Sequence, residues 1–439
     1  MEEAVAVQER PLSAGRQRYW VMLLLLVLVT VNYIDRANLS IAGPEMAKEF
    51  GWSLARLGFA FSAMFWVYTP MLLVWGAGID VIGTRMGYAI GLFIWAVASI
   101  ATGTINGFGT LLGARWALAI GESVAPPACA KVVREWAPIR DRGWSSGAFT
   151  AGYYLGPAVG YPICAWLVSS FGWRTMFFVL GGLTLLFVLL WLAVYWPPER
   201  ARWLRDAERQ LILSERDSAV LSAASPRGTM TRGDVLRHPT TWGLVVAQAV
   251  STYTVYLFLM WLPGYLLHTQ HINLMQAGIY STLPYIVALI ACIAYGWFSD
   301  RALDTASIDR GGRRRYVLAA MIANLAILLV PAVHNFGLII ALLAVSLAGS
   351  GCTLTANVAL ANDMLVDPRF AGLIFGLLGI GSNIVGLFAP IATGLVAQFT
   401  GGFGAAFLIA GTITAAGIAC VLLLVRSPIT ARTYREVAA

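Results

Sequence analysis

Residues 76–85 read GAGIDVIGTR and join two apolar stretches of the chain. Residues 296–301 read GWFSDR and occupy the same kind of junction much later, ahead of a basic loop that ends at Arg315. In both, a glycine stands four residues before an aspartate, and a basic turn follows. This pattern indicates close helix packing at the glycine and a carboxylate that faces donors at a membrane surface. One copy is weak evidence, but two copies at equivalent places predict two related halves.

The sequence around these junctions is that of a membrane protein. Of 439 residues, 59% are hydrophobic and 12% are charged, whereas soluble proteins are about half apolar and a quarter charged. This composition excludes an ordinary soluble enzyme, a disordered chain and a disulfide scaffold. A membrane span needs about 20 mostly apolar residues. Twelve stretches meet this requirement: 20–41, 56–79, 86–105, 109–131, 143–168, 174–196, 240–267, 277–299, 315–333, 337–363, 370–397 and 401–425.

The predicted fold is therefore all-α, with twelve transmembrane helices in two pseudo-symmetric bundles of six. Residues 1–196 are expected to form the first bundle and residues 240–439 the second. Residues 197–239 form a polar linker that contains eight arginines. Charges of alternating sign between Glu199 and Asp217 predict that this linker includes a solvated surface helix.

The basic residues predict how the chain is oriented. If both termini are cytoplasmic, all but five of the 30 Lys and Arg residues lie in cytoplasmic segments, as membrane topology favours. The net charge of +8 then reflects orientation and requires no nucleic-acid partner. The first apolar run has no clear small-residue cleavage site, so we expect it to be a retained span rather than a signal peptide.

Four charged residues fall inside apolar spans: Asp35, Arg36, Arg115 and Glu122. A charge at mid-bilayer costs at least about 2.5–3.5 kcal/mol, so these groups should face a cavity or pair with one another. Two acids and two bases can neutralise each other. Arg115 and Glu122 are seven residues apart and share a helix face, about 10 Å from each other. We place Asp35 and Arg36 toward the outer half of the first span.

Chemistry suggests roles for this cluster. Arginine is permanently charged and holds a carboxylate through two parallel hydrogen bonds. A buried carboxylate beside arginine can load and release a proton as a cavity opens and closes. Asp35 and Glu122 are the candidates for that exchange. The structural alternative is a static ion network that locks the first bundle, with Arg115 simply paired to Asp35.

The twelve spans, their division into six and six, and the doubled junction resemble the major facilitator superfamily over essentially the whole chain. The resemblance implies a substrate site near the midplane, between halves that rock to alternate access. A narrower resemblance is to the anion:cation symporter family, which takes up sugar acids and other organic anions. Five stretches carry it: NYIDRANLS at 32–40, Arg115 to Glu122 with Pro126-Pro127, WAPIRDRG at 136–143, FGWR at 171–174 and WLPGY at 261–265.

The family resemblance implies roles for individual residues. Asp35 and Glu122 would couple protons, Arg36 would hold the substrate carboxylate, and Arg115 would switch between acidic neighbours. Tyr33, Tyr68 and Asn383 resemble family positions that contact the substrate, although core packing, an interfacial ring or a helix–helix hydrogen bond would also explain them. Weaker candidates are Tyr153, Tyr154, Gln248, Tyr256, Thr353, Thr355, Asn357 and Asn362. The repeated junction predicts a cytoplasmic gate motif of Gly76, Asp80, Gly83, Arg85, Gly296, Asp300 and Arg301.

No catalytic, nucleotide-binding or metal-binding motif is evident. His268 and His271 are close in sequence but have no third ligand, so we expect neither a metal, nor a cofactor, nor an enzyme. The predicted function is proton symport of a small organic anion into a bacterium, most consistent with a sugar acid such as an aldonate or hexuronate. Alternatives are an aromatic or dicarboxylic acid (a hydroxyphenylacetate, phthalate or tartrate) or a transport-dead membrane sensor. We expect a monomer in the cytoplasmic membrane whose partners are the anion, protons and lipid.

Overall fold

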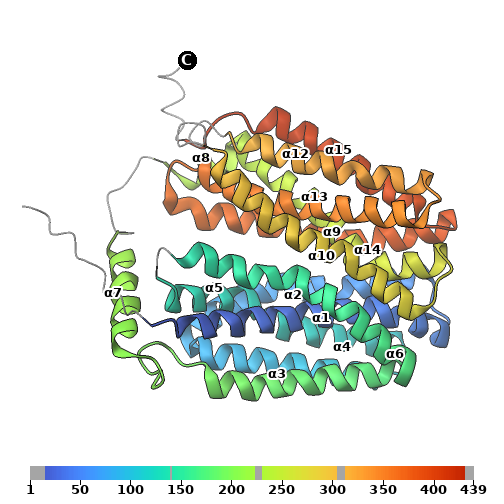
Figure 1. The fold of residues 1–439 in the computed structure, drawn as a ribbon, viewed down its shortest axis with the longest axis horizontal. Coiled ribbons are helices and arrows are strands. Elements are labelled where there is room, and N and C mark those ends of the chain that lie inside the picture. Colours follow the sequence, from blue (N-terminus) through green and yellow to red (C-terminus); the bar gives the residue numbers. More distant parts are fainter. Residues whose placement is uncertain (1–14, 139–140, 223–229, 304–311, 431–439) are drawn as a thin grey trace, which may run out of the picture.

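The computed structural model describes residues 15–138, 141–222, 230–303 and 312–430, which are almost entirely helical (Figure 1). In a bilayer the helix is favoured because it satisfies every backbone polar group within one segment. The helices of the first half are α1 (Arg18–Phe50), α2 (Leu54–Ile82), α3 (Thr84–Thr102), α4 (Phe108–Glu122), α5 (Ala125–Trp136) and α6 (Arg142–Val194). The connecting helices are α7 (Asp206–Ser222) and α8 (Arg232–Arg237). The second half contains α9 (Pro239–Thr269), α10 (Leu274–Arg301), α12 (Arg314–Asn324) with the 3₁₀ segment Leu325–Ala332, α13 (Phe336–Asp363), the 3₁₀ turn Pro368–Phe370, α14 (Ala371–Thr400) and α15 (Gly404–Leu424).

The helices account for all twelve predicted spans. Ten helical segments of the described residues are long and apolar enough to cross a membrane. One of these, α6, holds the fifth and sixth spans, which meet at Gly172, where φ is 83°. A further span is made of α4 and α5, which are separated by a turn and are each too short alone. The predicted all-α membrane fold is thus confirmed.

The first helix is longer than predicted. The expected span ended at residue 41, but α1 continues through Pro44 to Phe50. Asp35 is therefore near the midpoint of a 33-residue helix, and our placement of it toward the outer half was wrong. The apolar pattern missed this end because the last turns carry polar residues, while the chain stays helical until Gly51 adopts a left-handed conformation with φ of 67°.

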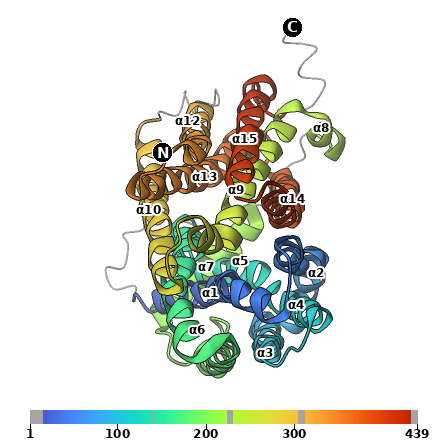
Figure 2. The same ribbon diagram turned by 90° about the vertical axis from the view of Figure 1, so that its right-hand side faces the viewer.

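The helices lie in two groups, with α1–α6 below α9–α15 in Figure 1. Across the boundary, α2 packs against α14, α6 against α10, and α1 against α9. Figure 2 looks at the end away from α7 and shows α2 beneath α14 and α6 beneath α10. We call the end that carries α7 the linker side and the other end the far side.

The helix α7 is packed against the first group of helices rather than solvated. Glu208 is fully buried and accepts hydrogen bonds from the backbone N–H groups of Gln17 and Arg18 at 3.0 and 3.1 Å. The guanidinium of Arg18 bridges Glu208 at 2.9 Å and Asp141 at 3.0 Å. Trp203 stacks on Trp136 of α5, with ring centroids 5.2 Å apart. A surface helix was predicted here as solvated, and α7 instead buries one face, because alternating charge does not reveal which acid is buried.

Candidate functional site

The four predicted intramembrane charges lie together in the first group of helices. Asp35, Arg36, Arg115 and Glu122 are 1%, 3%, 3% and 0% exposed. The Nε atom of Arg36 donates to Oε2 of Glu122 at 3.0 Å. A buried ion pair of this kind costs desolvation energy that its attraction only partly repays. Such a pair is therefore weak evidence for stability, and its position between the two groups of helices is better evidence for function.

Glu122 owes its position to a break in the fourth span. It is the last residue of α4. Residues 123–124 form the break, and α5 follows with Pro126 and Pro127 in its first turn. Proline is favoured in a first turn because it has no N–H to satisfy. The break leaves the Glu122 carboxylate inside the bundle with Oε1 unpaired. A buried acceptor without a partner is unusual and marks this carboxylate as a candidate site.

Asp35 and Arg115 do not form the direct ion pair that a purely structural role of Arg115 was expected to involve. Asn38 lies between them instead, donating from Nδ2 to Oδ1 of Asp35 at 2.9 Å and accepting at Oδ1 from Nη2 of Arg115 at 3.3 Å. The other oxygen of Asp35 accepts from Nε1 of Trp95 at 2.5 Å. Arg115 retains an unpaired Nε, so part of its binding capacity is unused in this conformation.

Aromatic rings enclose Arg36. Its guanidinium carbon lies 4.9 Å from the ring centroid of Tyr33 and 4.7 Å from that of Tyr68, within the range of cation–π attraction. Tyr153 stacks on Tyr33 at 4.7 Å. Arg36 also donates from Nη1 to the hydroxyl of Tyr256 at 3.5 Å. The predicted pair Tyr33 and Tyr68 therefore contacts the predicted anion-binding arginine, and Tyr256 adds a contact from the second half.

A cavity of about 510 Å³ lies between the two groups of helices on the linker side. Tyr153 and Tyr154 line it from α6, together with Ser146, Gly147, Thr150 and Ala151 of the same helix. The second half contributes Gln248, Leu289, Cys292, Ile293, Leu354, Thr355 and Val358. Its volume is in the usual range for a small-molecule site. Tyr153 lines this cavity and also stacks on Tyr33, whose ring contacts Arg36.

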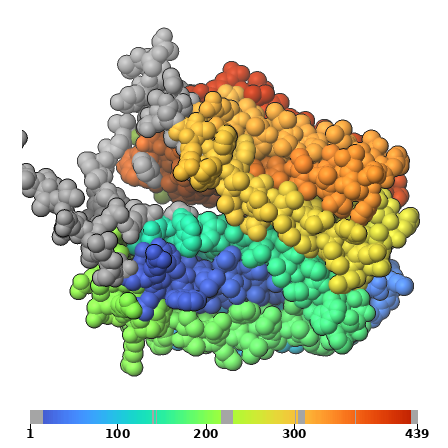
Figure 3. All heavy atoms as spheres, in the orientation of Figure 1, coloured from blue at the N-terminus to red at the C-terminus, as the bar shows by residue number. Residues whose placement is uncertain are grey.

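The far side is closed. Thr282 of α10 donates to the carbonyl of Ala158 of α6 at 2.9 Å, and the backbone N–H of Ala55 donates to Gln398 of α14 at 3.0 Å. Gly58 lies so close to α14 that a Cβ on it would be 2.5 Å from the carbonyl oxygen of Pro390. Figure 3 shows the two groups of helices in contact toward the far side and hollowed between them at the linker side. The molecule is thus open at one end only.

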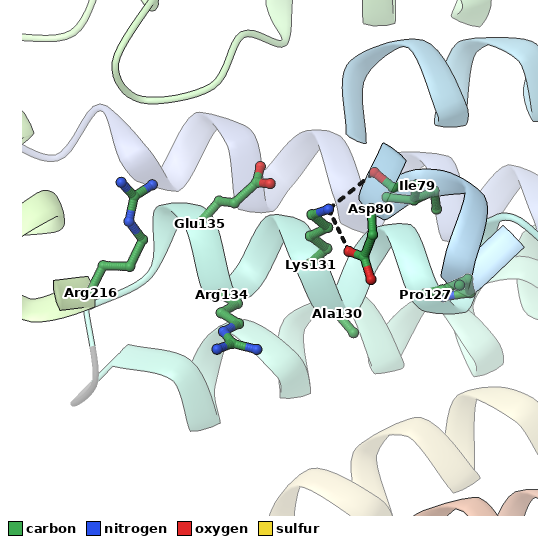
Figure 4. Close-up of a pocket in the computed structure, with 9 residues that line it drawn as sticks. Ile79, Asp80, Pro127, Ala130, Lys131, Arg134, Glu135 and Arg216 are labelled. Carbon is green, nitrogen blue, oxygen red and sulfur yellow. Dashed lines mark hydrogen bonds and ion pairs between the residues drawn. The ribbon is translucent and has the colours of Figure 1, made fainter. Parts of the chain in front are cut away.

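The first copy of the gate motif makes its contacts within one group of helices. Asp80 accepts from Nζ of Lys131 at 2.7 Å, as Figure 4 shows, and these residues line a pocket of about 500 Å³ with Arg216 of α7. Gly83 has φ of 81° and separates α2 from α3. Arg85 donates from Nε to the carbonyl of Tyr195 at 2.9 Å. The carboxylate therefore faces a donor, as predicted.

Close packing at the motif glycines was predicted wrongly for this conformation. A Cβ on Gly76 or on Gly296 would meet nothing within 4 Å. Both glycines lie toward the linker side, where the two groups of helices are apart. In the second copy, Arg301 lies over its neighbour Trp297 at 4.2 Å, while the side chain of Asp300 lies outside the described residues.

The remaining candidates differ in their positions. Asn383 is half-buried in α14 and does not line the cavity, and among the described residues it makes no hydrogen bond. Asn357 donates to the carbonyl of Leu244 and to Gln248, which explains it as a contact between helices. Thr353 bonds to its own helix, and Asn362 is exposed. Among the described residues, no three His, Cys, Asp or Glu side chains are grouped to hold a metal ion.

Sequence reasoning missed two residues of the charged cluster. Asn38 was present in the family-like stretch but received no role, although its spacing of three residues from Asp35 on a helix places both on one face. Trp95 gave no local signal, since one tryptophan among 16 in the chain resembles an interfacial or core ring. Only the packing of α3 against α4 and α6 brings its indole N–H to Asp35.

The chain is similar to known transporters over nearly its whole length. It is 28% identical to the D-galactonate transporter of Escherichia coli O6:H1, over 94% of this chain and 96% of that protein. It is 29% identical to the probable L-galactonate transporter of Escherichia coli K12, over 93% and 89%. The solved structure of a bacterial homologue of the human lysosomal transporter Spinster, in an inward-facing and unoccupied conformation, matches with a TM-score of 0.68 at 18% identity, covering 94% of this chain and 96% of that one.

The family assignment follows from a match along almost the entire chain. The model of the Major Facilitator Superfamily aligns with residues 25–308 and again with residues 305–438. These two alignments meet at residues 305–308, between α10 and α12 in the sequence of the second half, and the Spinster homologue shares the same overall fold. The predicted family is therefore confirmed. This multi-pass membrane protein belongs to the Major Facilitator Superfamily of transporters.

Proposed function

We propose that this protein imports a small organic anion together with protons across the bacterial cytoplasmic membrane. The observation that carries the proposal is the buried cluster of Asp35, Arg36, Arg115 and Glu122 where the two groups of helices meet. Two permanent cations can receive a carboxylate there, and two acids can exchange protons. The relatives named for galactonate and for galactarate or glucarate transport support a sugar acid as the substrate.

The proposed mechanism uses the two groups of helices as units that rock about the cluster. Residues 1–196 and 240–439 are the units, and residues 197–239 connect them. In the conformation described, the linker side is open and the far side is closed by contacts such as Thr282 with Ala158. We take the linker side as cytoplasmic, with both termini on it. The pairs across the far side would separate in the opposite state. Gly76 and Gly296, on which a Cβ now meets nothing within 4 Å, would then be covered.

Proton coupling would follow from the balance of charge. With both acids ionised, the cluster is neutral, and a substrate carboxylate would add a negative charge to a buried site. Binding of a proton to Asp35 or Glu122 offsets that charge, so the anion and the proton favour each other's binding. Release to the cytoplasm would reverse both steps. The protein would need only the proton gradient and would act as a monomer in lipid.

An aromatic or dicarboxylic acid is the second candidate substrate. The observation that favours an aromatic acid is the lining of the cavity, where Leu289, Ile293, Leu354 and Val358 present apolar surface from the second half. A polyhydroxylated anion would leave much of its hydrogen-bonding capacity unmet against that wall. A transport-dead sensor has no specific feature in its favour.

Uptake into proteoliposomes tests the proposal. Purified protein would be given a panel of labelled aldonates, hexuronates, aromatic acids and dicarboxylates, with and without an inward pH gradient. We expect uptake of at least one acid that the gradient accelerates and that a protonophore abolishes. An uptake rate that is unchanged by the pH gradient and by the protonophore would overturn proton symport. Competition among the acids for uptake shows whether the preferred substrate is a sugar acid or an aromatic acid.

A further inference from the structure

Asn38 joins two buried charges that do not touch each other. Asp35 on α1 and Arg115 on α4 both contact this amide, and among the described residues neither of them is in an ion pair. Asn38 is itself 1% exposed. A buried neutral amide between an acid and an arginine is an unexpected arrangement, because direct contact would give the stronger, charge-assisted hydrogen bond.

The polarity of the amide matches one protonation state of Asp35. An asparagine has a donor end and an acceptor end. Its Nδ2 donates to Asp35 at 2.9 Å, and its Oδ1 accepts from Arg115 at 3.3 Å. The second oxygen of Asp35 accepts from Trp95, whose indole can only donate. Both carboxylate oxygens are therefore held by N–H donors, and this network is complementary to an ionised Asp35.

Protonation of Asp35 would break this arrangement. A proton from the open aqueous side would convert the carboxylate to a carboxylic acid, whose O–H group requires an acceptor. Of the two side chains bonded to Asp35, only Asn38 offers one, at Oδ1, and that oxygen faces Arg115 rather than Asp35. If the amide turned its Oδ1 toward Asp35, its Nδ2 would face Arg115, donor against donor. Arg115 would then leave Asn38.

Once released from Asn38, Arg115 has two carboxylates available: that of Glu122 and that of an incoming substrate. The charged and titratable groups that act on Asp35 are Glu122 and Arg115 from α4, and Cys164 from α6 also lies near it. Glu122 has an unpaired Oε1 and Arg115 an unpaired Nε. Freed from Asn38, the guanidinium can therefore bind Glu122 or the carboxylate of an incoming substrate, without displacing the pair between Glu122 and Arg36.

We propose that Asn38 is a positioning residue that makes Arg115 available to the substrate only when Asp35 is protonated. The inference rests on the proposed function, since it assumes that the substrate is an anion and that protons accompany it. It assigns to one amide the step by which proton binding at Asp35 is converted into anion binding at Arg115. It also explains why a neutral side chain, rather than direct contact, connects the two charges.

The test compares Asn38→Leu and Asn38→Asp with the wild type in proteoliposomes. In the wild type, the apparent KM for the best acid should rise by more than about fivefold as pH increases, within the usual range of coupling between two ligands. Asn38→Leu removes both ends of the bridge, so its KM should change less than about twofold over the same pH range while substrate exchange persists. Asn38→Asp gives Arg115 a carboxylate partner that is lost only when this new side chain is protonated. Uptake should therefore be lost at neutral pH and partly recovered in acid.

Matched substitutions at Asn106, an exposed asparagine between α3 and α4, should leave the pH profile unchanged. A wild-type pH dependence of KM in Asn38→Leu, with only the maximal rate reduced, would overturn the inference and leave the proposed function standing. If Asn38→Leu does not fold, Asn38→Asp decides: equal loss at every pH contradicts the proposal. A wild type whose uptake ignores pH would overturn the proposed function itself.

Discussion

At the scale of single residues, the molecule concentrates its unusual chemistry in a few side chains of α1 and α4. The sequence alone identifies Asp35, Arg36, Arg115 and Glu122, because charge is conspicuous in an apolar span. The sequence does not reveal which of these charges form ion pairs with each other. Arg36, predicted to hold the substrate anion, is bonded to Glu122 at 3.0 Å. That pairing depends on the rotation of two helices about their axes, which spacing along the chain leaves open.

Neutral isosteres of the two acids should separate accumulation from exchange. A gradient of one pH unit is worth about 1.4 kcal/mol, or about tenfold accumulation, for each coupled proton. In Asp35→Asn and Glu122→Gln the coupled proton is lost, so the ratio of internal to external substrate should fall to near unity. Counterflow of labelled against unlabelled substrate should remain measurable. Failure of both variants to fold would instead support the static ion network.

At the scale of elements, packing determines what apolar patterns leave undecided. The repeated glycine–aspartate junction correctly predicted where α2 gives way to α3, and Gly83 supplies the positive φ there. The pattern did not predict the break between α4 and α5, although Pro126-Pro127 was the available signal. Alternating charge predicted a helix in the linker, but it did not predict that Glu208 of α7 is buried while Asp206 of the same helix is exposed. Sequence spacing does not distinguish these two acids.

The buried anchor of α7 should matter far more than its exposed neighbour. Glu208→Ala leaves Arg18 with one carboxylate and two backbone N–H groups unpaired, at a cost of about 3–5 kcal/mol. Asp206→Ala removes an exposed pair with Arg209 and should cost less than about 1 kcal/mol. Thermal unfolding in detergent measures both. Equal melting temperatures for the two variants would show that α7 is not an integral part of the first group of helices.

At the scale of the whole molecule, the two groups of helices touch at the far side and part at the linker side. Repetition and composition predicted twelve spans in two halves, but no sequence feature indicated which end is open. That property emerges from contacts between segments hundreds of residues apart, such as Ala55 with Gln398. It also explains why Gly76 and Gly296 lack neighbours here.

The open cavity can be probed with thiols. Cys292 lines it, whereas Cys164 is fully buried. In variants that retain only Cys292 or only Cys164 of the five cysteines, a hydrophilic maleimide added from the linker side should label Cys292 and spare Cys164. A transported acid should slow the labelling of Cys292. Rapid labelling from the far side only would mean that the cavity opens the other way.

The far-side closure can be blocked by one side chain. Gly58→Val places atoms where only a glycine fits, because even a Cβ would lie 2.5 Å from the carbonyl oxygen of Pro390. The two groups of helices should then remain separated on the far side, so net transport should be lost. The maleimide added from the linker side should label Cys292 slowly. Gly113→Val, where a Cβ meets nothing within 4 Å, serves as the control. Normal uptake by Gly58→Val would show that this contact does not form during the cycle.

We propose that the buried, charge-balanced cluster couples entry of an organic anion to entry of protons. The pH inside proteoliposomes loaded with a pH-sensitive dye, recorded when the transported acid is added outside at equal pH, tests this coupling directly. We expect internal acidification at a rate proportional to uptake, abolished in Asp35→Asn and Glu122→Gln. Uptake of the acid without any internal acidification would contradict it.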